Sequence, residues 1–177
     1  MEWLNEAPSW ETTGDVITVV SGAKTDFWRR THDGGIRDTG HFYYRPVTGD
    51  FRAEVHVAGK YRDLYDQAGL MVRLDETTWL KCGIELVDGV QQASVVVTRE
   101  YSDWSVVPLP ANPPAVGLLV TRHEGTFEVR YSVGAGPQAL LRQAFLTDSP
   151  TVSVGAMTAS PTGDGFSTRL QGLHIDT

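Results

Sequence analysis

Apolar and polar residues alternate along much of this chain. In segments 51–57, 67–74 and 80–87, apolar side chains stand at every second position. A period of two places one set of side chains on a buried face of a strand and the other set on the opposite face. Further strand candidates are 16–20, 41–47, 92–98, 116–122, 126–133, 140–145, 152–157 and 166–175. No segment has a long apolar period of 3.6 residues with matching caps, so helix should be scarce.

Turn residues separate the predicted strands. Gly49-Asp50, Asp88-Gly89 and Glu124-Gly125 are pairs typical of tight turns, and the Pro-rich stretch 108–114 reads as a loop because strands flank it. About eleven short strands in antiparallel order favour a two-sheet sandwich or jelly roll. A chain of 177 residues fits one domain. We therefore predict an all-β, two-sheet antiparallel jelly-roll β-sandwich as a single domain over residues 1–177.

Composition narrows the class of partner and the compartment. The chain has 22 acidic against 15 basic residues, a net charge of -7, which disfavours nucleic-acid or anionic-membrane binding. The one cysteine, Cys82, shares a predicted strand face with Leu80 and Ile84, which predicts a buried, unreactive thiol. The first residues lack a signal-peptide pattern, and no stretch approaches the ~20 apolar residues of a membrane span. We expect a cytoplasmic protein with no membrane and no nucleic-acid partner.

Five segments together resemble a known family. They are DFWRRTH at 26–32, GIRDTGHFYY at 35–44, DQAGLMVR at 66–73, WLKCGIE at 79–85 and SDWS at 102–105. In this order they resemble the bacterial YesU-like family, a domain of unknown function in the concanavalin A-like lectin and glucanase superfamily. The resemblance implies two packed antiparallel sheets, one curved, with a concave face on which superfamily relatives bind or cut glycans. It implies function only by analogy of fold.

Strand parity predicts a polar floor on that face. The residues expected to project together are Gln67, Met71, Lys81 and Glu85, with Gly69 and Gly83 leaving space between them. A glycine in a strand can allow close approach of a ligand. Such a floor would suit a saccharide or another polar small molecule. The alternative is a solvated sheet face with no ligand; Lys81 and Glu85 would not pair directly, because i and i+4 lie ~13 Å apart along a strand.

A second group of candidates comes from loops and aromatic residues. His32, Arg37, Asp38, His41 and Tyr43 lie among glycines that allow sharp turns, so their side chains could converge at a cleft edge. The alternative for each is local capping or ion pairing. Trp104 is a candidate platform for a sugar ring, as are Trp28 and Trp79, although tryptophan in a sandwich often packs in the core. A metal shared by His32, Asp38 and His41 is a minor alternative; we expect no metal and no cofactor.

Catalytic motifs are weak. Related glucanases place several acids on one strand, whereas the predicted floor here has only Glu85. Glycoside hydrolysis usually needs two carboxyl groups, about 5 Å or about 6.5–9.5 Å apart. The leading hypothesis is therefore a lectin-like, carbohydrate-binding protein. The alternatives are a glycosidase-type enzyme, with Glu85 and either Asp38 or His41 as acid and base, and a protein-interaction or regulatory module marked by an exposed apolar patch.

Overall fold

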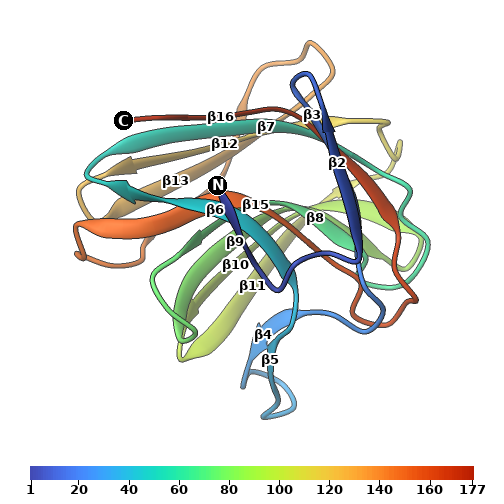
Figure 1. The fold of residues 1–177 in the computed structure, drawn as a ribbon, viewed down its shortest axis with the longest axis horizontal. Coiled ribbons are helices and arrows are strands. Elements are labelled where there is room, and N and C mark those ends of the chain that lie inside the picture. Colours follow the sequence, from blue (N-terminus) through green and yellow to red (C-terminus); the bar gives the residue numbers. More distant parts are fainter.

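The computed structural model describes residues 1–177 and consists of strands, turns and loops without a helix. Two seven-stranded antiparallel sheets pack face to face, as Figure 1 shows. The predicted all-β, two-sheet jelly-roll sandwich is confirmed. The first sheet contains, in spatial order, β1 (Glu2–Leu4), β6 (His41–Thr48), β15 (Thr151–Ala159), β8 (Gln67–Arg73), β9 (Thr78–Val87), β10 (Val90–Arg99) and β11 (Tyr101–Leu109).

The second sheet covers one face of the first. Its order is β14 (Ala139–Phe145), β13 (Thr126–Val133), β12 (Val116–His123), β7 (Phe51–Gly59), β16 (Ser167–Asp176), β3 (Val16–Val20) and β2 (Ser9–Thr13). Two further strands, β4 (Phe27–Arg29) and β5 (Ile36–Asp38), pair only with each other. We call residues 26–39 the hairpin. In Figure 1 it projects from the first sheet on the side away from the second sheet.

The main core lies between the two sheets. Alternate residues of β7 are buried there, including Ala53, Val55 and Val57, and they meet side chains such as Leu70 and Ile84 from the first sheet within one cluster of buried residues. This is the burial that period-two alternation predicts. Cys82 belongs to the same cluster, and burial raises the pKa of its thiol to about 12. The prediction of a buried, unreactive cysteine is confirmed.

A second apolar cluster lies on the opposite face of the first sheet, which we call the outer face. It contains Phe27 from the hairpin and five residues from the strands beneath it: Phe42, Met71, Trp79, Val96 and Met157. Phe27 is completely buried, and burying a phenylalanine side chain stabilises a protein by about 1.5–3 kcal/mol. The hairpin therefore covers part of the outer face and leaves the neighbouring part, over the middle of β8–β11, uncovered by apolar packing.

Polar contacts fix the hairpin in this position. Arg73 of β8 donates two hydrogen bonds to the Asp38 carboxylate, at 2.6 and 2.8 Å. Arg29 pairs with Glu100 at 2.9 Å, and its backbone N–H donates to the Ser102 hydroxyl at 3.0 Å. Charged bidentate contacts of this kind hold a defined geometry. The hairpin is thus anchored to β8 at one end and to the start of β11 at the other.

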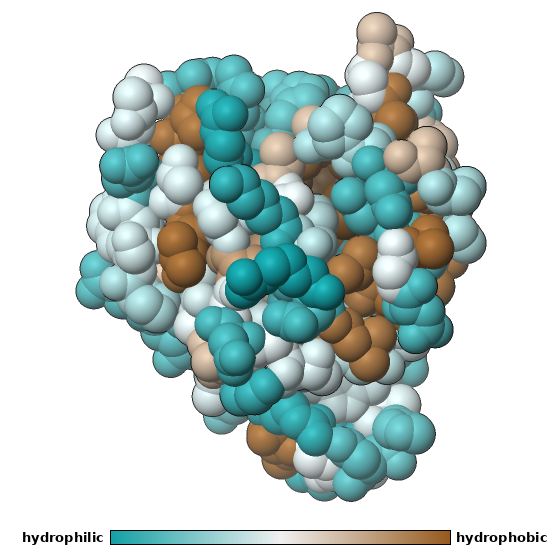
Figure 2. All heavy atoms as spheres, turned by 90° about the vertical axis from the view of Figure 1, so that its right-hand side faces the viewer, coloured by the Kyte–Doolittle hydropathy of each residue, from teal (hydrophilic) through white to brown (hydrophobic).

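Surface apolar side chains are dispersed. Those on edge strands include Val106 and Val107 of β11 and Leu140 and Phe145 of β14. On the side of the molecule seen in Figure 2, hydrophobic residues lie in separate groups divided by hydrophilic ones. No helix in the structure is long and apolar enough to cross a membrane.

Gly69 and Gly83 lie directly opposite each other in β8 and β9. A Cβ on Gly69 would lie 1.9 Å from the Cys82 carbonyl oxygen, and one on Gly83 would lie 2.1 Å from the Ala68 carbonyl oxygen. The sequence analysis expected these glycines to leave space for a ligand. Their first role is different: the two backbones approach so closely that neither position accommodates a side chain.

Replacing Gly83 should therefore destabilise the sandwich. We expect Gly83→Ala to lower the free energy of unfolding by about 1–3 kcal/mol, as overpacking in a rigid core does. Chemical denaturation monitored by tryptophan fluorescence would measure it. Gly117→Ala in β12 is the control, because a Cβ there meets first the Ser132 hydroxyl, a side-chain atom that can move. Equal stability of the two variants would contradict this account.

Candidate functional site

A cleft of about 840 Å³ lies between the hairpin, the adjoining loops and the uncovered part of the outer face. Its volume is within the range of small-molecule sites, roughly 300–1,000 Å³. The residues that line it are Lys24, Asp26, Trp28, Thr31, His32, Asp33, Arg37, Tyr65, Gln67, Lys81, Glu85, Val96, Ser102, Asp103, Trp104, Pro161 and Thr162. Most are polar, and they come from segments far apart in the sequence.

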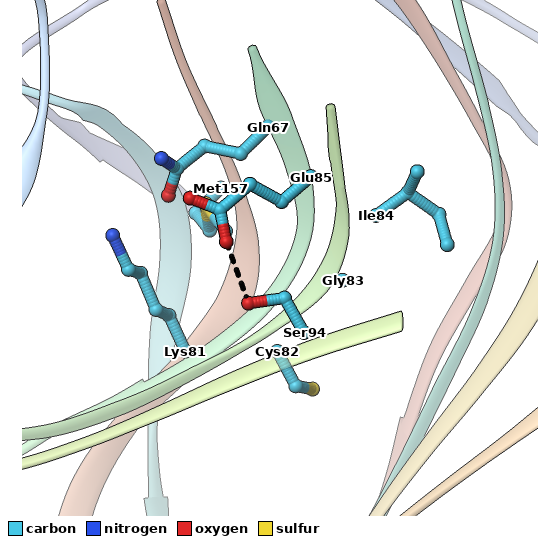
Figure 3. Close-up of a pocket in the computed structure, with 8 residues that line it drawn as sticks. All are labelled: Gln67, Lys81, Cys82, Gly83, Ile84, Glu85, Ser94 and Met157. Carbon is cyan, nitrogen blue, oxygen red and sulfur yellow. Dashed lines mark hydrogen bonds between the residues drawn. The ribbon is translucent and has the colours of Figure 1, made fainter. Parts of the chain in front are cut away.

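Glu85 is the buried acid of the cleft floor. Its side chain accepts hydrogen bonds from the Ser94 hydroxyl at 2.8 Å and from the Trp104 indole N–H at 2.9 Å. Both donors bind the same oxygen, Oε2; Figure 3 shows the bond from Ser94. Burial raises the pKa of Glu85, while the nearby Lys81 charge and the two hydrogen bonds oppose that rise.

Lys81 lies on the same face of β9 as Glu85, four residues earlier in the chain. Only 4% of its surface is exposed. Its ammonium group donates to the Phe27 carbonyl oxygen at 2.6 Å and lies 3.5 Å from an Asp26 carboxylate oxygen. Its partners thus belong to the hairpin rather than to Glu85. The same contacts hold the hairpin backbone against the floor.

Gln67 completes the floor on the β8 side. It lies opposite Glu85 in the β8–β9 pairing, and Figure 3 shows the two side chains turned toward each other. The amide nitrogen of Gln67 donates to the Tyr65 carbonyl oxygen at 3.1 Å. Beside these side chains the floor narrows to a niche of about 10 Å³, which Ser94, Gly83 and Met157 also line. A space of this size holds about one water-sized group.

Aromatic side chains form part of the walls. Trp104 of β11 is 41% exposed, and its indole N–H is held by Glu85 and also lies 3.1 Å from the Ser94 hydroxyl. Tyr65 meets the Trp104 ring edge-on, with 6.2 Å between ring centroids. Trp28 of the hairpin donates its indole N–H to the Thr31 carbonyl oxygen at 2.7 Å. Trp104 therefore combines a fixed orientation with exposed ring surface.

Arg37 and Lys24 at the rim both have partners. Arg37 pairs with Asp33 within the hairpin, and the hydrogen bond from Arg37 is the largest cause that lowers the pKa of Asp33 to about 2. Lys24 donates to the Thr162 carbonyl oxygen and lies 3.8 Å from Asp164. No three His, Cys, Asp or Glu side chains lie close enough together to hold a metal ion.

Six of the residues expected from the sequence line the cleft and four do not. Those in the cleft are His32, Arg37, Gln67, Lys81, Glu85 and Trp104. Met71 has the expected strand parity, opposite Lys81, but it is fully buried beneath Phe27. Trp79 is buried in the same cluster, so the expectation that it offers a sugar platform is wrong. Strand parity predicts on which face of a sheet a side chain lies, but not which other segment covers that face.

The other three expected residues have structural partners. Asp38 is bound by Arg73. His41 lies 2.6 Å from the Asn5 carbonyl oxygen and accepts the backbone N–H of Gly22 at 2.8 Å. Tyr43 packs between Trp3 and Trp10, with ring centroids 4.9 and 5.5 Å away. Neither Asp38 nor His41 is thus placed to act with Glu85 as acid or base.

The sequence analysis also missed part of the site. Asp26, Tyr65 and Asp103 line the cleft, and Ser94 binds Glu85. Ser94 could have been found, because it follows the alternation of its strand and lies opposite Gly83. Asp26 and Tyr65 lie outside the strands, where no periodicity places a side chain.

The fold and the cleft together define a β-sandwich protein with a polar pocket on the outer face of one sheet. The chain belongs to the DUF1349 family of proteins of unknown function, whose model matches residues 3–177. A curated relative from Saccharomyces cerevisiae, "Regulation of enolase protein 1", is 39% identical over 164 residues, which span 93% of this chain and 83% of the relative. The match therefore covers most of both proteins.

Solved structures show the same architecture. A crystal structure of a functionally unknown protein from Saccharomyces cerevisiae superposes with a TM-score of 0.94 at 36% identity, covering 99% of this chain and 95% of that one. The carbohydrate-binding module CBM66 from Bacillus subtilis superposes with a TM-score of 0.62 at 11% identity, covering 99% and 95%. At that identity the second likeness concerns the fold alone.

The raised pKa of Glu85 predicts how stability depends on pH. A folded-state pKa above the unfolded value of about 4.5 means that the folded protein holds a proton more tightly, so this group's contribution falls as pH rises from 4.5 toward the folded pKa. Glu85→Gln removes that dependence. We expect the stability of Glu85→Gln relative to wild type to increase as pH rises from below 4.5, as measured by denaturant unfolding at each pH. A constant or decreasing difference would contradict the raised pKa.

Proposed function

We propose that this protein binds a saccharide in the cleft between the hairpin and strands β8–β11. The observation that carries the proposal is the combination of a half-exposed, oriented Trp104 with a buried polar floor in a cleft of about 840 Å³. An apolar sugar face can lie on an indole ring, while the hydroxyls of the sugar meet polar groups. The shared fold of a carbohydrate-binding module agrees with this role.

The arrangement favours binding over hydrolysis. Glu85 has a raised pKa, as a general acid would need. A second free carboxylate beside it is required for either stereochemical course. Asp26 is engaged by Lys81, Asp33 by Arg37, and Asp38 by Arg73. Asp103 has no ion pair, but it alternates with Trp104 along β11, so strand parity directs its side chain away from Glu85. We therefore propose a lectin-like protein rather than a glycosidase.

Regulation of an enzyme is a second candidate, which the name of the yeast relative favours. The edge strand β11 carries the exposed side chains of Tyr101, Val106 and Val107 beside the cleft. A protein that regulated enolase in response to sugar would bind the sugar in the cleft and enolase on the neighbouring edge strand. Sedimentation of the protein with enolase from its own organism, with and without sugar, tests this candidate; no association in either condition would remove it.

Two finer assignments complete the proposal. The YesU-like motifs suggest a place within the concanavalin A-like lectin and glucanase superfamily, and we propose that placement for the chain. We also propose a cytoplasmic location with no membrane or nucleic-acid partner, because the net charge of -7 repels both anionic surfaces.

Loss of Trp104 should weaken saccharide binding. We expect a neutral mono- or disaccharide to shift the NMR signals of cleft residues in wild type, and Trp104→Ala to weaken that binding about tenfold, since a ring contact is worth up to about 1.5 kcal/mol. Titration with a panel of pentoses, hexoses and their disaccharides provides the measurement.

Tyr101→Ala is the matched control, since Tyr101 is an exposed aromatic residue on the same strand but outside the cleft. It should bind sugar like wild type. Signal shifts that spread over the second sheet, or binding to Trp104→Ala with the wild-type affinity, would place the sugar elsewhere. The absence of any shift at concentrations that saturate millimolar sites would refute saccharide binding.

A further inference from the structure

The hydrogen-bonding groups of the cleft indicate which class of saccharide it accepts. We infer that the cleft binds neutral sugars, which donate hydroxyl hydrogens to its floor, and discriminates against sugar acids and sugar phosphates. This inference rests on the proposed saccharide-binding function. It adds a rule of selection, which follows from the donors, acceptors and charges of the cleft.

Several donors around Glu85 are already used within the protein. Ser94 and Trp104 both donate to Glu85, and the Trp28 indole donates to Thr31. The amide nitrogen of Gln67 donates one hydrogen bond to Tyr65. An ionised carboxylate or phosphate group offers only acceptors, so to bind Ser94 or Trp104 it would have to displace their hydrogen bonds to Glu85. Breaking a buried hydrogen bond leaves its partner unsatisfied, which is costly.

The groups left free on the floor are acceptors. Both hydrogen bonds to Glu85 end on Oε2, so Oε1 receives none from the protein, and the Gln67 side-chain oxygen likewise receives none. Figure 3 shows the ends of these two side chains next to each other. When Glu85 is ionised, both oxygens can accept hydrogen bonds from a ligand.

The shape of the niche agrees with a hydroxyl group. Its volume of about 10 Å³ admits a group the size of a water molecule. A sugar hydroxyl is of this size and donates one hydrogen bond while accepting another. A carboxylate or phosphate group is larger and cannot donate when ionised.

Two cations of the cleft already have anionic partners. The buried ammonium of Lys81 is neutralised by Asp26, and Arg37 is paired with Asp33. An anionic ligand on the floor would compete with Asp26 for Lys81 and also approach the carboxyl group of Glu85. Like charges and unpaired buried charges both weaken binding.

The experiment uses the whole protein and a matched series of sugars. Isothermal titration would compare glucose, glucuronate and glucose 6-phosphate, and the corresponding galactose series, which differ in one substituent on one ring. We expect at least one neutral sugar to bind, and its acidic and phosphorylated counterparts to bind at least about tenfold more weakly. Trp104→Ala identifies the binding that occurs in the cleft.

Asp26→Asn tests the cause of the discrimination. Removing this carboxylate leaves Lys81 without its anionic partner. The ratio of the affinity for the neutral sugar to that for its acid should therefore fall by about threefold or more. Asp103→Asn is the matched control, because it makes the same change of charge at an exposed position of the rim with no ion pair. It should lower this affinity ratio less. Adding Lys81→Met to Asp26→Asn removes the unpaired ammonium and should restore the ratio.

The outcomes separate the inference from the function on which it rests. Binding of a sugar acid or sugar phosphate as tight as that of its neutral counterpart, and weakened in Trp104→Ala, would overturn the selection rule while leaving saccharide binding in place. Binding of none of these sugars would count against both. The comparison in wild type decides the rule even if the Asp26 variant does not fold.

Discussion

The buried ammonium of Lys81 connects the sandwich to the hairpin that shapes its cleft. A buried charge is tolerated only when it is paired and hydrogen-bonded. Both partners, the Phe27 carbonyl oxygen and the Asp26 carboxylate, belong to the hairpin. The position of the hairpin over the outer face is therefore coupled to a residue in the middle of β9. Phe27, fully buried beside this contact, adds apolar packing to the electrostatic one.

The hairpin divides the outer face into two regions of different chemistry. Beneath it, large apolar residues such as Met71 and Trp79 are buried, so the face acts as a second small core. Beyond it, Gln67, Lys81 and Glu85 remain in contact with a cleft, which Trp104 borders on the β11 side. A sheet face that would be solvated in an isolated sandwich thus becomes partly core and partly pocket. On the floor of the pocket Gln67, Lys81 and Glu85 each make at least one hydrogen bond within the protein.

The comparisons and the site carry different kinds of information. The DUF1349 family and the yeast relative establish what kind of chain this is. The likeness to a carbohydrate-binding module establishes that the sandwich is shared by proteins of low identity. A shared fold does not imply a shared ligand, because binding depends on the side chains of the site. The case for a neutral saccharide therefore rests on the hydrogen bonds and charges around Glu85.

The sequence by itself determined the all-β class, the alternating faces of β7–β9 and the burial of Cys82, because these follow from local periodicity. It also placed Gln67, Lys81 and Glu85 on one face, as the pairing of β8 with β9 requires. Only the tertiary structure decided that Met71 and Trp79 are covered, that Asp38 binds Arg73, and that His41 and Tyr43 lie outside the cleft. The path of the hairpin across the outer face determines that Met71 and Trp79 are covered and that Asp38 meets Arg73. That path depends on long-range contacts such as Lys81 with Phe27. Strand parity carries no information about contacts between residues so far apart in the chain.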